Sequence, residues 1–272
     1  LIEDLILIND LIIKKRGALL LQPPPTQPSY IQLEKYNLYS VICFSTALII
    51  VISLIVSQNI SHVLLLALII SIAMLTLYSF LIAFIFGKIK FTPLTFLTFA
   101  WGAFSTVPSL IIELILLHTF PTRWFGFTAF IEEPLKMIGL YFLAVNPLLT
   151  REYADHLDGL MYGVSTGLGF SFLETLLFTS RFLAQGLESY ILVRCITIAM
   201  HIFCSGIIGW WIGYLKIFRI KISLNTVLPS LLYSTLLHCI WNTLDLLGTA
   251  SIPIITALSL VLIYLLSKIA KE

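Results

Sequence analysis

The chain has 272 residues, of which 59% are hydrophobic and only 11% are charged, and its mean hydropathy is +1.01. A soluble domain cannot hide so much apolar surface while showing so few charges to water, so the composition excludes that class and predicts an integral membrane protein. A net charge of +2, with scattered lysines and arginines, excludes a nucleic-acid-binding surface.

The N-terminal region differs from the rest of the chain. Residues 1–13 are apolar but include three acidic residues and are too short to cross a bilayer, which predicts an interfacial helix. The stretch "QPPPTQPSY" at 22–30 predicts an extended, proline-rich linker. No cationic segment precedes an apolar core, so a cleavable signal peptide is not expected. We therefore assign 1–35 to an interfacial segment and linker, and 36–272 to a membrane-embedded domain.

Long apolar segments follow this linker. A window of about 19 residues, long enough to cross about 30 Å of hydrocarbon, is the usual test for a spanning helix. It selects eight segments, at 38–57, 62–87, 92–118, 124–147, 157–180, 188–215, 225–247 and 250–268. The sequence therefore predicts an all-α fold, a polytopic bundle of about eight helices that span the lipid bilayer.

Basic residues are unevenly distributed about these segments. With eight spans, most lysines and arginines lie on one side of the membrane, and only Arg123 and Arg181 lie in connections on the other side. Cytoplasmic loops carry the excess of these residues in membrane proteins. We therefore expect a multi-pass protein of the cell membrane with both termini in the cytoplasm.

Glycines recur every four residues in two neighbouring spans. Gly159, Gly163 and Gly167 form a stripe in the segment 157–180, and Gly209 and Gly213 lie in the next one. Small residues at this spacing let two helical backbones approach closely. The pattern predicts tight packing between these helices.

Polar residues interrupt four consecutive spans at a similar depth. A rise of about 1.5 Å per residue places the acidic pair of the segment 124–147 roughly 12 Å below its outer end, and the polar residues of the next three spans roughly 7 to 19 Å below theirs. The residues are Glu132, Glu133, Glu174, Arg194, His201, His238 and Asn242. Ionisable groups are costly in hydrocarbon, so we expect them to face the bundle interior or a water-filled cavity.

Spacing also places the polar residues of each span on one helix face. The pairs are Glu132 and Lys136, Phe170 and Glu174, and His238 and Asn242 at a separation of four, and Arg194 and His201 at seven. The simplest arrangement brings the four polar stripes around one pocket. Alternatively, the charges only form ion pairs that hold the helices in register. Those pairs would be Lys136 with Glu132 and Arg194 with Glu174.

Three further acids lie near the ends of apolar segments. We expect structural roles for Glu113, Asp158 and Asp245. Asp245 follows His238 by seven residues, so it shares a helix face with that histidine and is a candidate partner for it.

Several familiar enzyme motifs do not apply to this chain. "GVSTG" at 163–167 matches G-x-S-x-G, but that motif needs a turn between a strand and a helix, and here it lies within an apolar segment. H-E-x-x-H, G-x-G-D, a P-loop and a dinucleotide fingerprint are absent. The cysteines lie in apolar runs without C-x-x-C spacing, which predicts neither disulfides nor a thiolate metal site.

Four short stretches instead occur in order on successive spans. They are "EEPLK" (132–136), "DGLMYGVSTGLGFSFLE" (158–174), "AMHIF" (199–203) and "HCIWN" (238–242). Through their E-E-x-x-K, F-x-x-x-E, single histidine and H-x-x-x-N elements, the chain resembles the PrsW family of intramembrane proteases. That family is similar in turn to the CAAX prenyl endopeptidase and bacteriocin self-immunity group, whose second motif ends in histidine where this chain has Glu174.

The resemblance implies an activity and a set of catalytic residues. The implied activity is cleavage of a membrane-anchored protein, an anti-sigma-factor-like regulator in the best-known case. Glu132, with Glu133 beside it, would activate a water molecule. His238 and Asn242 would hold that water or donate hydrogen bonds to the developing oxyanion.

The resemblance also implies residues that support the chemistry. Glu174 and His201 would ligate a metal or orient the water, and with His238 they would make an acceptable zinc set. The further supporting residues are Lys136, Arg194 and Phe170. Zn²⁺ is one candidate cofactor, and hydrolysis driven by carboxylates alone is the alternative.

Two other classes of protein are compatible with the same polar residues. One is a non-catalytic membrane protein of bacteriocin-immunity or scaffold type, which would use the cluster to bind a partner. The other is a proton-coupled transporter, because buried glutamate, histidine and lysine also serve proton relays. We favour the membrane-embedded peptidase, whose expected partners are a membrane-anchored protein substrate and the lipid bilayer.

Overall fold

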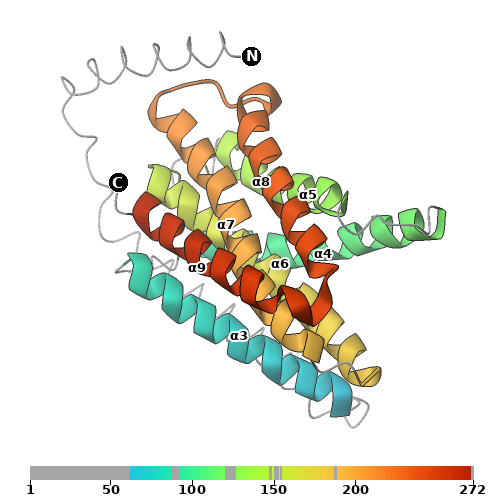
Figure 1. The fold of residues 1–272 in the computed structure, drawn as a ribbon. Helices are drawn as coiled ribbons and strands as arrows, with labels where there is room; N and C mark the ends of the chain where they lie inside the picture. Colours follow the sequence, from blue (N-terminus) through green and yellow to red (C-terminus); the bar gives the residue numbers. More distant parts are fainter. Residues whose placement is uncertain are drawn as a thin grey trace.

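The computed structural model describes residues 62–86, 92–119, 127–146, 149, 153, 155–186 and 189–270. These residues form seven α-helices and one short 3₁₀ helix (Figure 1). The helices are α3 (His62–Phe86), α4 (Pro93–Thr119), α5 (Ala129–Val145), α6 (His156–Ala184), α7 (Ser189–Ile217), α8 (Leu224–Asp245) and α9 (Ile252–Ile269), with η3 (Gly248–Ser251) before α9. The described part of the chain contains no strand, which confirms the all-α prediction.

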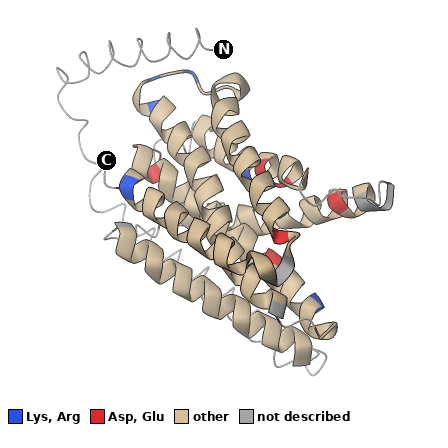
Figure 2. Cartoon of the chain, in the orientation of Figure 1, with Lys and Arg blue, Asp and Glu red and all other residues tan. Residues whose placement is uncertain are grey.

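Each of these helices corresponds to one predicted apolar segment. The first predicted span, 38–57, and the proposed segment 1–35 lie outside the described residues, so both stay predictions. Five of the helices, α3, α4, α6, α7 and α9, are long and apolar enough to cross a membrane. Figure 2 shows long uncharged stretches along them, interrupted by few acidic and basic residues. The chain is therefore a multi-pass membrane protein in which α5 and α8 are the shorter or more polar helices.

The predicted glycine stripe packs α6 directly against α7. A Cβ atom on any of the three α6 glycines would collide with a carbonyl oxygen of α7. The contacts are Gly159 with Gly209, Gly163 with Ser205 and Gly167 with His201. The close approach of the two backbones is confirmed, and it fixes the backbone of His201 against α6.

Helix α4 packs against the other side of α6 in a similar way. A Cβ on Gly102 would meet the carbonyl oxygen of Thr166, and one on Gly169 would meet that of Phe99. The Ser165 hydroxyl donates across the same contact to the carbonyl oxygen of Thr95, at 2.6 Å. Helix α6 is therefore held between α4 and α7.

Side-chain hydrogen bonds attach α5 and α8 to this layer. The indole of Trp101 donates to the Leu135 carbonyl oxygen at 3.0 Å and lies over Gly139, which binds α5 to α4. The Ser234 hydroxyl donates to the Cys204 carbonyl oxygen at 2.9 Å, which binds α8 to α7. Helices α5, α6, α7 and α8 thereby share one interior region.

The structure also describes the GVSTG stretch and three of the four cysteines. The "GVSTG" stretch lies within α6 and forms no strand-to-helix turn. Cys195, Cys204 and Cys239 are free thiols, and Cys43 lies outside the described residues.

Candidate active site

Charged and histidine side chains are buried together where α5, α7 and α8 meet. In the described part of the chain, those that are at most 4% exposed are Glu132, Glu133, Lys136, His201 and His238. Burying an ion in an apolar interior is costly unless it has a partner of opposite charge and hydrogen bonds. The contacts of each residue therefore indicate what holds it there.

Glu133 is the central acceptor of the cluster. Its Oε1 atom lies 2.6 Å from Nζ of Lys136 and 2.8 Å from Nδ1 of His238. The carboxylate therefore neutralises the buried lysine and orients the imidazole that comes from α8. The ion pair of Lys136 is thus formed with Glu133, and the expected pair with Glu132 was wrong. The two residues of the observed pair are three apart and lie on one face of α5.

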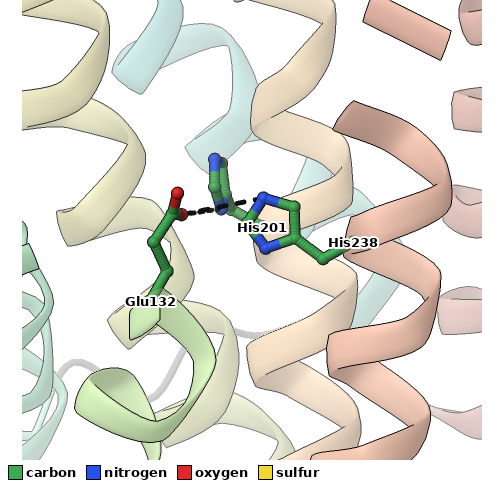
Figure 3. Close-up of side chains that lie close together, drawn as sticks. All are labelled: Glu132, His201 and His238. Atoms are coloured by element: carbon green, nitrogen blue, oxygen red, sulfur yellow. Dashed lines mark ion pairs between the residues drawn. The ribbon is translucent and has the colours of Figure 1, made fainter. Parts of the chain in front are cut away.

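Glu132 faces both histidines without a hydrogen bond to either. Its Oε2 atom lies 3.6 Å from Nε2 of His238 and 4.0 Å from Nδ1 of His201 (Figure 3). This oxygen is buried and has no hydrogen-bond partner. The two imidazole rings lie 4.9 Å apart and are nearly perpendicular, at 88°. A carboxylate oxygen and ring nitrogens from three helices thus converge on one small region.

Glu174 reaches the cluster from α6. Its Oε2 atom lies 2.8 Å from Nε2 of His201, although not in hydrogen-bond geometry, and its Oε1 atom lies 2.5 Å from Nη2 of Arg194. The expected ion pair between Arg194 and Glu174 is therefore confirmed. Asp245, the candidate partner of His238, lies with its Oδ2 atom 3.8 Å from Nη1 of Arg194. A second group of charges thus adjoins the first through His201.

Phe170 forms an aromatic wall beside the cluster. Nζ of Lys136 lies 4.3 Å from the centre of its ring, a cation–π distance, and 3.0 Å from Nδ1 of His201. The Phe170 ring lies 5.1 Å from the ring of His201. Phe170 and Glu174 therefore contact the same histidine from successive turns of α6.

Asn242 connects α8 to the start of α5. Its side-chain amide nitrogen donates to Oγ1 of Thr128 at 2.9 Å. Thr128 is the residue before the first turn of α5 and lies one helical turn before Glu132. Sequence reasoning missed Thr128, and the available signal was a threonine directly before an apolar helical run.

Glu113 and Asp158 lie outside the five-residue cluster. On α4, the Ser109 hydroxyl donates to Glu113 at 2.8 Å. Asp158 lies in the first turn of α6, where its backbone amide donates to the capping carboxylate of Asp155 at 2.7 Å. Both arrangements are those of residues that stabilise a helix locally.

Comparison with known proteins places the chain in a family. The family model described as "PrsW family intramembrane metalloprotease" matches residues 90–267, which is more than half of the chain and includes every residue of the cluster. The chain belongs to the PrsW family.

Curated members of the PrsW family are similar to the chain over part of their length. Protease PrsW of Geobacillus kaustophilus (strain HTA426) is 28% identical over 161 residues, which are 59% of this chain and 64% of the relative. Protease PrsW of Bacillus subtilis (strain 168) is 28% identical over 113 residues, 40% of this chain and 49% of the relative. Protease PrsW of Oceanobacillus iheyensis is 27% identical over 184 residues, 68% of this chain and 77% of the relative. The chain thus spans less than two thirds of the length of the first two relatives, and no solved structure matches it.

The description of the PrsW family as metalloproteases implies a metal ion, and the residues present fit one. Glu132, His201 and His238 each offer one ligand atom, and these atoms lie within 4.8 Å of one another. One carboxylate with two imidazoles is a common zinc-binding set. Oε2 of Glu132 is a buried acceptor without a hydrogen-bond partner, as expected of a ligand atom. The contact of Glu133 with His238 is of the kind that orients histidine ligands.

Proposed function

We propose that this PrsW-family chain is an intramembrane endopeptidase that hydrolyses a peptide bond in a membrane-anchored protein. The observation that carries the proposal is the position of Glu132, whose unpartnered Oε2 atom faces two imidazoles in a buried site. Ionisable groups are costly in contact with lipid, so an active site within a bilayer has to be built from polar side chains that face the interior of the helix bundle. The curated relatives, each named Protease PrsW, support the same activity.

In the proposed reaction, Glu132 acts as the general base toward water. It takes a proton from the water as the water oxygen attacks the carbonyl carbon of the substrate. The carbon–nitrogen bond then breaks, and the proton passes from Glu132 to the leaving nitrogen. Positioned acids and bases of this kind contribute about 10²–10⁴-fold to a rate.

His238 and Lys136 would stabilise the negative charge that develops. With Nδ1 of His238 donating to Oε1 of Glu133 at 2.8 Å, Nε2 points toward the region beside Glu132 and would donate to the oxyanion when the ring carries a proton on both nitrogens. The ammonium group of Lys136 adds a fixed positive charge 3.0 Å from His201. Such preorganised groups act strongly in a site closed to bulk water.

Glu132, His201 and His238 would hold a zinc ion if the enzyme uses one. Held there, zinc would lower the pKa of a bound water and act as a Lewis acid. In that form the proton acceptor would be Oε2 of Glu133, the other buried carboxylate oxygen of the pair without a hydrogen-bond partner. Glu174, for which the resemblance implies metal ligation or orientation of the water, would then act on His201 from its Nε2 side. Asn242 would contribute by fixing Thr128 and the start of α5.

The substrate class and the orientation of the chain in the membrane are parts of this proposal that rest on the sequence alone. An anti-sigma-factor-like regulator is the substrate implied by the family resemblance, and the excess of basic residues on one side favours cytoplasmic termini. A relationship to the CAAX prenyl endopeptidase group is part of the same proposal. So is the division of the chain into an N-terminal segment, 1–35, and a membrane-embedded domain, 36–272.

The test compares the wild type with two variants of the site and one control. Wild type, Glu132→Gln and His238→Ala, purified in detergent, are incubated with tagged single-span membrane proteins that include an anti-sigma factor. Asp158→Asn is the control, because it removes a carboxylate roughly 24 Å away from Glu174 along α6 at the helical rise per residue. We expect fragments with the wild type and Asp158→Asn and a loss of at least 10²-fold with the site variants. Cleavage that all four proteins perform equally, or that none performs, would exclude the proposed peptidase.

A further inference from the structure

His201 has polar neighbours on both ring nitrogens. Nδ1 lies 3.0 Å from Nζ of Lys136 and 4.0 Å from Oε2 of Glu132, on the side of the candidate active site. Nε2 lies on the other edge of the ring, 2.8 Å from Oε2 of Glu174. A half-turn of the ring about its Cβ–Cγ bond would replace both nitrogens by carbons. The nitrogen that His201 offers to Glu132 therefore depends on the group that holds Nε2.

That group, the carboxylate of Glu174, is shared between the imidazole of His201 and the guanidinium of Arg194. One oxygen lies 2.8 Å from His201 and the other lies 2.5 Å from Nη2 of Arg194. A carboxylate with a partner on each oxygen cannot rotate without losing one of them, and contacts to ionised groups are the stronger kind. Arg194 therefore restricts the position of the oxygen that faces His201.

Arg194 is itself held from two neighbouring helices. Its Nη1 atom lies 3.8 Å from Oδ2 of Asp245 on α8, and its Cζ atom lies 4.5 Å from the ring centre of Phe178 on α6. Arg194 precedes His201 by seven residues, so both side chains leave the same face of α7. The side chains of Asp245, Arg194 and Glu174 are 18%, 12% and 12% exposed, whereas that of His201 is 1% exposed. Asp245, Arg194 and Glu174 thus connect the partly exposed edge of the bundle to the buried His201.

We propose that Arg194 is a positioning residue of the candidate active site. It holds Glu174 against Nε2 of His201 and so keeps Nδ1 turned toward Glu132 and Lys136. Arg194 contacts neither the substrate nor a reacting atom. The effect on turnover rests on the proposed peptidase function, whereas the effect on the ring of His201 does not.

The direct test observes the imidazole of His201. Wild type, Arg194→Gln, Arg194→Lys and Arg181→Gln are labelled with ¹⁵N-histidine and purified in detergent, and the resonances of His201 are identified by their loss in His201→Ala. Arg181 is an exposed arginine in the last turn of α6 and serves as the matched control. We expect Arg194→Gln to shift the ring ¹⁵N resonances of His201, Arg194→Lys to shift them less, and Arg181→Gln to leave them unchanged.

A kinetic comparison separates positioning from a general loss of structure. We expect Arg194→Gln to lower kcat about 10- to 100-fold, as for other residues that orient a histidine of a site, with KM changed less than about threefold. Wild-type His201 resonances in folded Arg194→Gln would overturn the proposal, and so would a change in KM alone. If Arg194→Gln does not fold, Arg194→Lys decides, because altered His201 resonances support the proposal and wild-type resonances overturn it. A wild type that cleaves nothing, with the expected change in His201, would contradict only the proposed function.

Discussion

The Nδ1 atom of His238 lies 2.8 Å from Oε1 of Glu133, which joins the imidazole of α8 to a carboxylate of α5. The same oxygen lies 2.6 Å from Nζ of Lys136, so Glu133 holds two partners in a fully buried position. The adjacent Glu132 instead turns an unpartnered oxygen toward the histidines. Because neighbouring acids have such different contacts, their removal should have different consequences.

Glu133→Gln should destabilise the fold much more than Glu132→Gln. The first substitution leaves Lys136 as a buried charge without its carboxylate, and breaking a buried ion pair from one side costs about 3–5 kcal/mol. The second removes a carboxylate whose Oε2 has no hydrogen-bond partner, so in metal-free protein the free energy of unfolding should change by less than about 1 kcal/mol, and cleavage should be lost. Thermal unfolding in one detergent measures both effects.

The double substitution Glu133→Gln with Lys136→Met serves as the control for this comparison. It removes the uncompensated charge as well as its partner, so it should recover part of the stability. Equal destabilisation by the two single glutamine variants would contradict the different contacts assigned to the two acids.

Gly163→Ala should separate α6 from α7. The added methyl group would meet the carbonyl oxygen of Ser205, and backbone cannot yield as a side chain can. We expect a loss of about 1–3 kcal/mol in the free energy of unfolding, as for other overpacked positions. Gly206→Ala is the control, because its methyl group would meet only side-chain ends, the nearest at 3.3 Å. Similar stability of the two variants would show that the helices do not pack as closely as described.

Chelation should lower stability and activity together if zinc binds the three converging side chains. A ligand present at 100 times its Kd stabilises a protein by about 2.7 kcal/mol, and chelation should remove that amount. Elemental analysis should find zinc in the wild type and little in His201→Ala or His238→Ala, whose unfolding should not respond to chelator. An active, metal-free wild type that ignores the chelator would instead favour hydrolysis by the carboxylates alone.

Asn242→Ala and Thr128→Ala should show a coupled loss of stability. Their side chains share one hydrogen bond of 2.9 Å between α8 and the start of α5, and such a bond contributes about 0.5–1.5 kcal/mol. A double-mutant cycle measures the coupling. Thr243→Ala is the control, because the hydroxyl of Thr243 is exposed and donates only to the Cys239 carbonyl oxygen of its own helix. Strictly additive losses at residues 128 and 242 would exclude the contact.

Much of the fold was predictable because the bilayer simplifies the problem. A spanning segment must satisfy its backbone hydrogen bonds internally, so a long apolar run implies a helix, and the predicted segments from 62–87 onward each correspond to one. The glycine stripe also predicted a contact, since only close approach explains small residues at that spacing. The gathering of polar residues from four helices followed from helical rise and facing alone.

The sequence by itself determined the helices, the membrane setting and the residues that must avoid lipid. Only the tertiary structure decided which of those residues contact one another. Glu132 and Glu133 are adjacent and differ by about 100° in direction around α5, so the rotation of that helix determines which acid holds Lys136 and which faces the histidines. Contacts of Trp101 with α5 and of Asn242 with Thr128 set that rotation, and both join residues far apart in the chain. Local periodicity fixes the directions of side chains relative to their own helix but carries no information on how that helix is turned against its neighbours.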